Sequence, residues 1–188
     1  MNENLFFDRA QLRRCGSNVT IGKTVRIRYP ELVEIADNVI IDDFSYISTA
    51  LVIDGHVHIS AGAKIIGGKT AIVRFESFST LAPNVVLAAG SDDYIAGVAT
   101  PMVPKEYKGN AVIGSIAIGR HCIVGAGTVV LPNVRMHEGA AVGALSLVKG
   151  DLEPWTLYAG IPAKPLRQRD RDRILSLEMQ YLHGDGHN

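Results

Sequence analysis

Two adjacent carboxylates, Asp92 and Asp93, stand in a part of the sequence that could do acid–base chemistry. A carboxylate can take a proton from a nucleophilic hydroxyl or amino group, or accept a hydrogen bond that orients it. His56, in "IDGHVHI", is a second candidate, because imidazole has a pKa of about 6.5 and a carboxylate one of about 4. We therefore predict Asp92, Asp93 and His56 as catalytic candidates. The alternatives are a solvated turn at the two aspartates and a surface pair formed by His56 and His58.

Residues around the acidic pair could hold the acceptor of such a reaction. Ser91 and Tyr94 flank the two aspartates, Asn84 precedes them, and we expect all three to bind the substrate. The stretch "AAGSDDYIAGVATPMVPKEYKGN" (88–110) has no periodic pattern, and long insertions of this kind are functional or disordered. Its two tyrosines, its apolar residues and its two prolines favour an ordered loop.

An isoleucine at every sixth position marks the element that must position these residues. The positions are Ile35, Ile41, Ile47, Ile53, Ile59 and Ile65. Six residues carry a side chain roughly 240° around an α-helix, whereas in an extended chain all six-spaced side chains point to one side. Isoleucine is β-branched and suits a strand, and residues such as Asp42-Asp43 between the isoleucines favour bends. The repeat predicts very short strands with a turn at every sixth residue.

The same period returns after the aperiodic stretch. The second run is Val112, Ile118, Val124, Val130, Met136, Val142 and Val148, and Ile72 and Phe78 extend the first run after a one-residue offset. Small or compact residues follow the markers by four positions, as a tight inner corner requires, at Val39, Ser45, Val57, Ala63, Thr128, Ala140 and Ser146. Hexapeptide repeats are typical of a parallel β-helix, whose stacked coils bury their inner faces against each other.

Composition and charge exclude several classes of protein. The 188 residues, 47% of them hydrophobic, can bury one sizeable core. The 19 basic and 19 acidic residues give a formal net charge of zero, which argues against a nucleic-acid-binding protein. We find no segment apolar enough for a signal peptide or a membrane span, and the cysteines, Cys15 and Cys122, lie outside metal-ligand spacing. We expect free thiols, no metal and a cytoplasmic location.

The aliphatic markers with small residues four positions later resemble the repeats of the hexapeptide-repeat acyltransferases, over roughly residues 17 to 167. The resemblance implies an all-β solenoid, a left-handed parallel β-helix with three hexapeptides in each triangular coil. It predicts an N-terminal arm with a short helix at 1–16 and the β-helix, with a protruding loop at 88–110, at 17–153. Residues 154–188 are expected to form a coenzyme-site segment and a C-terminal α-helix.

The segments "VGAGTVV", "VGALSLVK" and "GIPAKPLR" are similar to segments of sugar acetyltransferases of the galactoside and maltose type, and of relatives that act in surface-polysaccharide biosynthesis. In those enzymes they bind acetyl-coenzyme A. The resemblance implies coenzyme contacts at Gly125, Ala126, Ala144 and Lys149 for the pantetheine arm, and at Lys164 and Arg167 for the phosphates. Small side chains would leave backbone amides open to the pantetheine, and Lys and Arg form charge-assisted bonds to phosphates. A solvated surface pair is the alternative for Lys164 and Arg167.

One departure from that family concerns the catalytic base. The galactoside-type enzymes carry a histidine after a stretch like "PNVVL", and here Asp92 falls on its position, or Ser91 after a one-residue shift. An amino group is nucleophilic once neutral, so the departure favours N-acetylation over O-acetylation. The expected reaction transfers acetyl from acetyl-CoA to an amino or hydroxyl group of a sugar, which we expect to carry a nucleotide.

The resemblance also implies a homotrimer, in which the loop of one subunit helps to form the active site of a neighbour. We expect neither a nucleic acid nor a membrane as a partner. Two alternatives stay open: a β-solenoid scaffold without catalysis, and a carbonic-anhydrase-like member of the same fold, which would bind zinc through histidines between subunits. No third histidine at useful spacing supports such a zinc site.

Helices are predicted near both ends of the chain. "DRAQLRRCG" favours a short helix with Asp8 as its N-cap and Gly16 after its end. "RDRDRILSLEMQYLHG" favours a helix that stops at Gly184 and packs on the base of the prism or on another subunit. Its apolar face consists of Ile174, Leu175, Met179 and Leu182. We expect Trp155 to cap the last coil rather than to bind a ligand.

Overall fold

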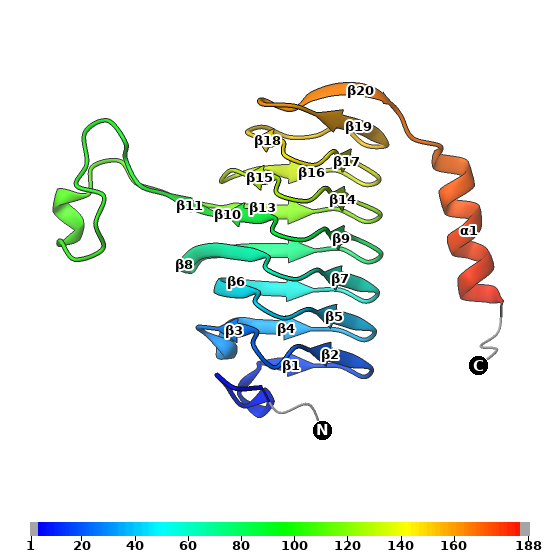
Figure 1. Cartoon of the computed structure of the whole chain (residues 1–188), viewed down its shortest axis with the longest axis horizontal. Coiled ribbons are helices and arrows are strands. Elements are labelled where there is room, and N and C mark those ends of the chain that lie inside the picture. The colour runs from blue at the N-terminus through cyan, green and yellow to red at the C-terminus, as the bar shows by residue number, and fades with distance from the viewer. Residues whose placement is uncertain (1–3, 185–188) are drawn as a thin grey trace.

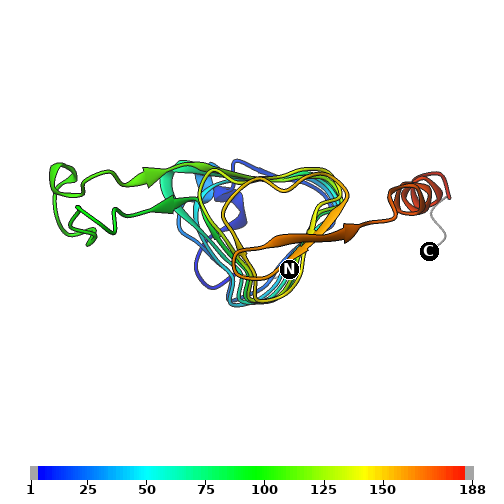
Figure 2. The same ribbon diagram turned by 90° about the horizontal axis from the view of Figure 1, so that it is seen from above.

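The computed structural model describes residues 4–184, which form a triangular prism of stacked coils with a long loop and a helix on opposite sides (Figures 1 and 2). The prism is a left-handed parallel β-helix. Almost every strand pairs in parallel with the strand one coil above it and the strand one coil below it. The fold class predicted from the hexapeptide period is therefore confirmed.

The strands are short and the helices few. The strands are β1 (Arg14–Cys15), β2 (Val19–Ile21), β3 (Arg26–Ile27), β4 (Val33–Ile35), β5 (Val39–Ile41), β6 (Tyr46–Ile53), β7 (Val57–Ile59), β8 (Lys64–Phe75), β9 (Thr80–Leu81), β10 (Val86–Ala88), β11 (Gly90–Ser91), β12 (Val112–Ile113), β13 (Ser115–Ile118), β14 (Ile123–Val124), β15 (Val129–Val130), β16 (Arg135–Met136), β17 (Ala141–Val142), β18 (Leu147–Val148), β19 (Thr156–Ala159) and β20 (Lys164–Gln168). The helices are η1 (Arg9–Gln11), η2 (Pro30–Leu32), η3 (Lys105–Tyr107) and α1 (Arg171–His183).

A regular coil contains 18 residues, so a residue lies directly above the one 18 positions earlier. Val39 pairs with Val57, for example, and Ile123 pairs with Ala141. The six isoleucine markers all lie in the core with an exposed fraction of at most 1%. Val39, Ser45, Val57, Ala63, Thr128, Ala140 and Ser146, the compact residues four positions after them, are buried too. The inner face of the prism is thus the one that the repeat predicts.

The predicted register is wrong in the coil that contains Ile72 and Phe78. Tyr46 pairs with Lys64 as expected, but Leu51 pairs with Val73, so four extra residues enter β8 at its bend instead of one. The core positions of this coil are therefore taken by Ala71, Val73 and Phe75, while Ile72 and Phe78 are only partly buried. In the second run, the prediction that Val112 is an inner marker is also wrong, because Val112 is 41% exposed and pairs with Ser91 at the neck of the loop.

Three corners join the faces of the prism, and we name each by what it carries. At the loop corner, residues 92–111 leave the prism between β11 and β12. The helix corner consists of the turns that contain His56, Phe78 and His121, and α1 lies beside it. The Asn84 corner consists of the turns that contain Gly62, Asn84 and Gly127, which are stacked through backbone hydrogen bonds. Three insertions interrupt the regular coils: two extra residues around Tyr29, the four extra residues in β8, and the long loop. All three lie at the loop corner.

The ends of the chain differ in part from the prediction. Asp8 caps η1 as expected, but η1 is a single 3₁₀ turn that ends at Gln11, well before Gly16. Helix α1 ends at Gly184 as predicted. It packs along the helix corner rather than on the base of the prism, and Met179 and Leu182 of its expected apolar face are more than half exposed.

The remaining sequence expectations concern cysteines and membranes. Cys15 and Cys122 are both free thiols, and burial raises the pKa of the Cys122 thiol to about 12. Trp155 is buried in the turn of the last coil, where its backbone N–H donates to the Glu138 carbonyl. No helix within residues 4–184 is both long enough and apolar enough to cross a membrane.

Candidate active site

Three residues predicted to contact the coenzyme lie together at the Asn84 corner. Gly125 donates its N–H to Val142, and a side chain at Gly125 would collide with the backbone of Ala144 in the coil above. The Ala126 carbonyl accepts from Leu145 at 2.8 Å. Among residues 4–184, the N–H groups of Ala126 and Ala144 make no backbone hydrogen bond. Small side chains thus leave amide groups accessible along this corner, as a pantetheine arm requires.

The closing segment of the β-helix lies on top of the same corner. Ser146 Oγ donates to the Gly143 carbonyl and accepts from the Gly160 N–H, and the Ala163 N–H donates to Leu147 at 2.8 Å. Lys164, next in the chain, begins β20 and is exposed. The segment therefore places one cation above the small residues of the corner.

Arg167 lies elsewhere than Lys164. It pairs with Leu157 in the antiparallel ladder of β19 and β20, while Lys164 pairs with Ala159 at the other end of the strand. Arg167 lines a groove of about 510 Å³ between β14, β17, β19 and the first turn of α1, together with Ile123 and Ile174. Lys149 is exposed two residues beyond Leu147. Lys164 and Arg167 thus lie at opposite ends of β20 and do not converge on one point.

Asn84 is the predicted acceptor residue that lies closest to the coenzyme residues. Its backbone has a positive φ of 60°, which asparagine tolerates well, and its N–H donates to Ala61 at 3.0 Å. Gly127, one coil higher, donates to Pro83, the neighbour of Asn84. The exposed Asn84 side chain therefore lies one coil below the corner formed by Gly125 and Ala126.

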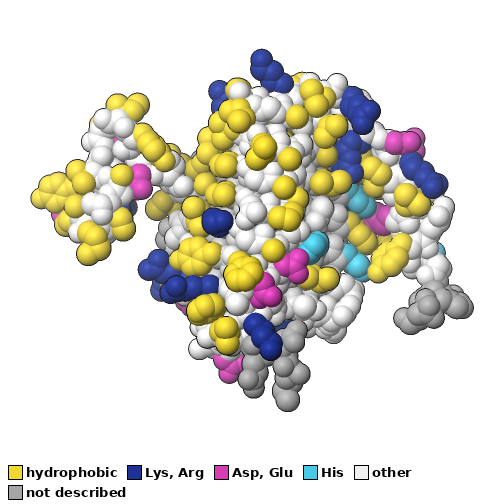
Figure 3. All heavy atoms as spheres, viewed as in Figure 1, with side chains coloured by type: hydrophobic (Ala, Val, Ile, Leu, Met, Phe, Trp, Pro, Cys, Tyr) yellow, Lys and Arg dark blue, Asp and Glu magenta, His cyan; other side chains and the backbone are white. Residues whose placement is uncertain are grey.

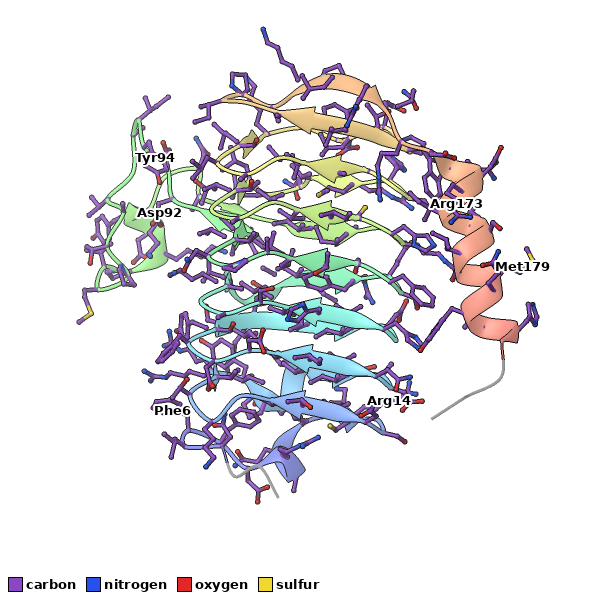
Figure 4. All side chains as sticks on the ribbon, turned by 45° about the vertical axis from the view of Figure 1, so that its right-hand side comes forward. Phe6, Arg14, Asp92, Tyr94, Arg173 and Met179 are labelled. Atoms are coloured by element: carbon purple, nitrogen blue, oxygen red, sulfur yellow. The ribbon has the colours of Figure 1, made fainter. Side chains whose placement is uncertain are left out.

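Ser91 and Asp92 mark the point where the chain leaves the loop corner. Ser91 pairs with Val112 in a two-residue antiparallel neck, and its Oγ donates to the Asp92 carbonyl at 3.2 Å. The Asp92 side chain is exposed (Figure 4). Among residues 4–184 it forms no ion pair within 4 Å. The Asp92 carboxylate is thus free to meet a substrate.

Asp93, in contrast, holds the loop together. Its Oδ1 accepts from the N–H groups of Ile95 and Ala96, at 2.9 and 3.0 Å, and its Oδ2 accepts from Asn110 at 2.9 Å. These backbone bonds, the one from Asn110 most of all, lower the pKa of the partly exposed Asp93 carboxyl. A carboxylate that is stabilised in this way is a weaker proton acceptor, so the geometry favours Asp92 for the catalytic role that we predict for the pair.

The tip of the loop is apolar and points away from its own prism. Tyr94 is 92% exposed, Ile95 97% and Met102 86% (Figure 4). Figure 3 shows hydrophobic side chains gathered on the loop, away from the prism. Such a cluster needs a second surface to cover it.

His56 lies at the helix corner, where it contacts α1, and the loop that carries Asp92 leaves the prism on the opposite side from α1 (Figure 2). Its ring stacks on Phe78 at 4.7 Å, meets Tyr181 of α1 edge to face, and contacts Asn38 through Nε2 at 3.2 Å. A count of eighteen residues per coil would allow His56 to lie below the acidic loop of the same chain. This is wrong, because four extra residues enter β8 and bring Phe78 above His56. The neighbouring His58 forms a surface pair with Asp42 at 2.8 Å.

Sequence reasoning missed a buried polar cluster at the helix corner. Glu178, the only buried residue of α1, accepts from Arg120 and from His121 Nε2, the latter at 2.9 Å. Arg169 donates to the carbonyls of His121 and Gly139. A glutamate between Leu177 and Met179 on a helix gives no signal of such a contact, because its partners are 57 and 58 residues away. The cluster fixes α1 and one wall of the Arg167 groove.

The helix corner makes a prediction about pH. Burial of the ring lowers the pKa of His121, and Arg120 and Arg169 lower it further, although Glu138 opposes them. The unfolded chain therefore takes up this proton more readily, and stability is lost as the pH falls below about 6.5. We expect the melting temperature of wild type to fall more steeply between pH 7 and pH 5 than that of His121→Gln. Parallel curves for the two proteins would contradict this role of His121.

One chain therefore brings only part of the predicted site together. Asn84, Gly125, Ala126, Ala144 and Lys164 share the Asn84 corner, whereas Ser91, Asp92 and Tyr94 lie at the loop corner and His56 at the helix corner. Within residues 4–184, no three His, Cys, Asp or Glu side chains are grouped so that they could hold a metal ion.

Known proteins resemble this chain over nearly its full length. No protein-family model matches it. It is 38% identical over 184 residues to the dTDP-4-amino-4,6-dideoxy-D-glucose acyltransferase of Escherichia coli, which covers 92% of this chain and 93% of that protein. It is 26% identical over 165 residues to the galactoside O-acetyltransferase of Escherichia coli K12, which covers 81% of this chain and 80% of that protein.

Solved structures of sugar acyltransferases also resemble this chain over nearly its full length. The chain superposes on AntD, an N-acyltransferase from Bacillus cereus, with a TM-score of 0.90 and 32% identity, covering 97% of this chain and 99% of AntD. That structure contains dTDP-4-amino-4,6-dideoxyglucose and coenzyme A, and another structure of AntD contains dTDP and 3-hydroxybutyryl-CoA. AntD has also been solved with a serine or an aspartate replaced.

Proposed function

Because this chain belongs to the hexapeptide-repeat sugar acyltransferases, we propose that it transfers an acetyl group from acetyl-CoA to the 4-amino group of dTDP-4-amino-4,6-dideoxyglucose. The observation that carries the proposal is the 38% identity, over nearly the full length of both chains, to an acyltransferase of that name. The product would be an N-acylated nucleotide sugar for surface-polysaccharide biosynthesis, made in the cytoplasm. Incubation with both substrates should give a product heavier than the acceptor by one acetyl group, and an unaltered acceptor would refute the proposal.

An amino acceptor fits the residues of the site. Asp92, at the position where the galactoside-type enzymes carry a histidine, has an exposed carboxylate that can accept a hydrogen bond from a sugar amine. A neutral amine attacks the thioester carbonyl directly and forms a carbon–nitrogen bond. The carbon–sulfur bond then breaks, coenzyme A leaves as a thiolate, and the attacking nitrogen loses a proton. Asp92 is proposed to orient the amine and to receive that proton. Asn84, Ser91 and Tyr94 are proposed to hold the sugar around it.

We propose that the active site is composite and that the enzyme is a homotrimer. The coenzyme residues at the Asn84 corner and Asp92 at the loop corner lie at different corners of one chain. A cyclic assembly would bring the loop of one subunit against the Asn84 corner of the next and would cover Tyr94, Ile95 and Met102. His56 could take part only across such an interface.

The coenzyme assignment makes a kinetic prediction. Lys164→Ala combined with Arg167→Ala should raise the KM for acetyl-CoA about tenfold, because charge-assisted bonds to phosphate are lost, while the KM for the acceptor stays within twofold. Since the two cations lie at opposite ends of β20, the single variants will show which one faces the phosphates. Lys23→Ala combined with Arg173→Ala, which removes the same two residue types at exposed positions outside the loop, is the matched control. An unchanged KM for acetyl-CoA in the first double variant would place the phosphate site elsewhere.

A further inference from the structure

A patch of exposed cations lies on the prism below the protruding loop. It consists of Arg26, Arg28, Lys64 and Lys69, and we call it the basic patch. Figure 3 shows Lys and Arg side chains gathered there with apolar ones, at the lower left edge of the prism. Among residues 4–184, none of the four cations is in an ion pair with a carboxylate. In a chain with a net charge of zero, such a local surplus of positive charge favours an anionic ligand.

Aromatic rings lie among these cations. Lys69 reaches across the coil of β6 and lies 5.0 Å from the centre of the Tyr29 ring, and Arg28 lies 5.4 Å from the same ring. Arg26 lies 5.9 Å from the ring of Phe6, which is 55% exposed. The rings hold the cationic side chains in place without neutralising them. An exposed ring next to fixed cations suits a ligand that joins phosphates to a flat base.

The register of the coils shows that this corner is enlarged. Arg26 pairs with Tyr46, 20 residues later, whereas Val33 pairs with Leu51 at the regular 18, so two extra residues lie around Tyr29. Four extra residues, with Lys69 among them, enter β8 at the same corner two coils higher. The long loop leaves from the next coil above. Insertions in a solenoid lie on one side, and that side is often the one that binds ligands.

The basic patch also lies in the right place relative to Asp92. Gly90, at the neck of the loop, lies directly above Gly67, with only 3.3 Å between the Cα of Gly67 and a Cβ built on Gly90. Lys69 follows two residues after Gly67, and Tyr29 lies lower at the same corner. A sugar that meets Asp92 at the neck would therefore have Lys69 and Tyr29 below it at the same corner.

We propose that the basic patch binds the diphosphate and the base of a nucleotide-linked acceptor, with Arg28 and Lys69 on the phosphates and the partly exposed ring of Tyr29 against the base. This inference rests on the proposed function, which requires a nucleotide sugar, and adds the place where the nucleotide binds. The acceptor then extends along the loop corner, with its sugar at Asp92 and its nucleotide on the lower coils. The coenzyme occupies the upper coils.

Isothermal titration calorimetry with dTDP tests the assignment. The double variant Arg28→Met and Lys69→Met should raise the Kd for dTDP about tenfold or more, because two charge-assisted contacts to phosphate are lost. The Kd for coenzyme A should stay within twofold. The ratio of the Kd for dTMP to the Kd for dTDP should be smaller in the double variant than in the wild type. The single variant Tyr29→Leu should also weaken the binding of dTDP. All three side chains are at least partly exposed, so circular dichroism should show an unchanged melting curve.

The control and the contrary results separate this inference from the proposed function. Arg173→Met combined with Lys23→Met, which removes one exposed Arg and one exposed Lys outside the basic patch and outside the loop, should leave the Kd for dTDP unchanged. If dTDP binds the wild type and the Arg28/Lys69 variant equally well, the patch is not the nucleotide site, although the proposed function stands. If the wild type binds coenzyme A but not dTDP, the proposed acceptor is wrong. If the variant instead loses its assembly in sedimentation, the patch is a subunit contact and the inference fails.

Discussion

Replacing Asp92 by asparagine is expected to lower kcat by roughly 10² or more, with a smaller change in the KM for acetyl-CoA. Asparagine keeps the shape of the side chain and can still accept a hydrogen bond, but it cannot receive the proton that the attacking group loses. The measurement is steady-state release of coenzyme A with dTDP-4-amino-4,6-dideoxyglucose as the acceptor. A loss confined to the acceptor KM would mean that Asp92 only orients the amine.

Two further variants complete that experiment. Asp93→Asn keeps one side-chain oxygen for the loop backbone, so it should affect the acceptor KM more than kcat, because the loop is less firmly held. His56→Ala should leave kcat near that of wild type unless the helix corner of a neighbour reaches the site. A larger loss of kcat in His56→Ala than in Asp92→Asn would transfer the role of the base to the histidine.

Mixing two inactive variants should restore activity if the site is composite. Ala144→Trp places a bulky ring in the proposed pantetheine path without entering the core, since Ala144 is exposed. Asp92→Asn leaves that path intact. In trimers reassembled at random from equal amounts of both variants, roughly a quarter of the interfaces combine an intact loop with an intact Asn84 corner. We therefore expect activity to rise from near zero to about a quarter of the wild-type value.

The controls for mixing are each variant alone carried through the same dissociation and reassembly. A site contained within one chain predicts no recovery, because every chain in the mixture would carry one defect. Sedimentation of the wild type as an active monomer at micromolar concentration would likewise exclude the composite site.

Much of this fold can be predicted from the sequence, because few structures other than a parallel β-helix have β-branched residues at every sixth position. The inner residues, the compact corners and the end of α1 at Gly184 all follow from local rules. The insertion in β8 does not. If the six-residue spacing is assumed to continue, Ile72 and Phe78 are predicted as the buried positions of this coil instead of Val73 and Phe75. Only the pairing of Leu51 with Val73 reveals the four extra residues. That error in register also misplaced His56.

The site was less predictable than the fold. Asp92 and Asp93 are neighbours of one type, and only the three backbone bonds to Asp93 separate a loop-holding carboxylate from an available one. The Glu178 cluster and the basic patch depend on contacts between distant coils, such as that of Lys69 with Tyr29. No local pattern encodes such contacts. Gly125, Ala126 and Ala144 were expected from the resemblance to sugar acetyltransferases, and the stacking of the coils places them at one corner.

We propose that the chain acylates the amine of a dTDP-linked amino sugar. The most direct test compares kcat/KM for dTDP-4-amino-4,6-dideoxyglucose with that for its analogue carrying a hydroxyl group in place of the 4-amino group, under the same concentration of acetyl-CoA. We expect efficient acylation of the amino sugar at nitrogen. The kcat/KM for the hydroxyl analogue should be lower by a factor of roughly 100 or more, because an aspartate is a weaker base than the histidine that O-acetylation uses. Equal or faster acylation of the hydroxyl analogue would contradict it.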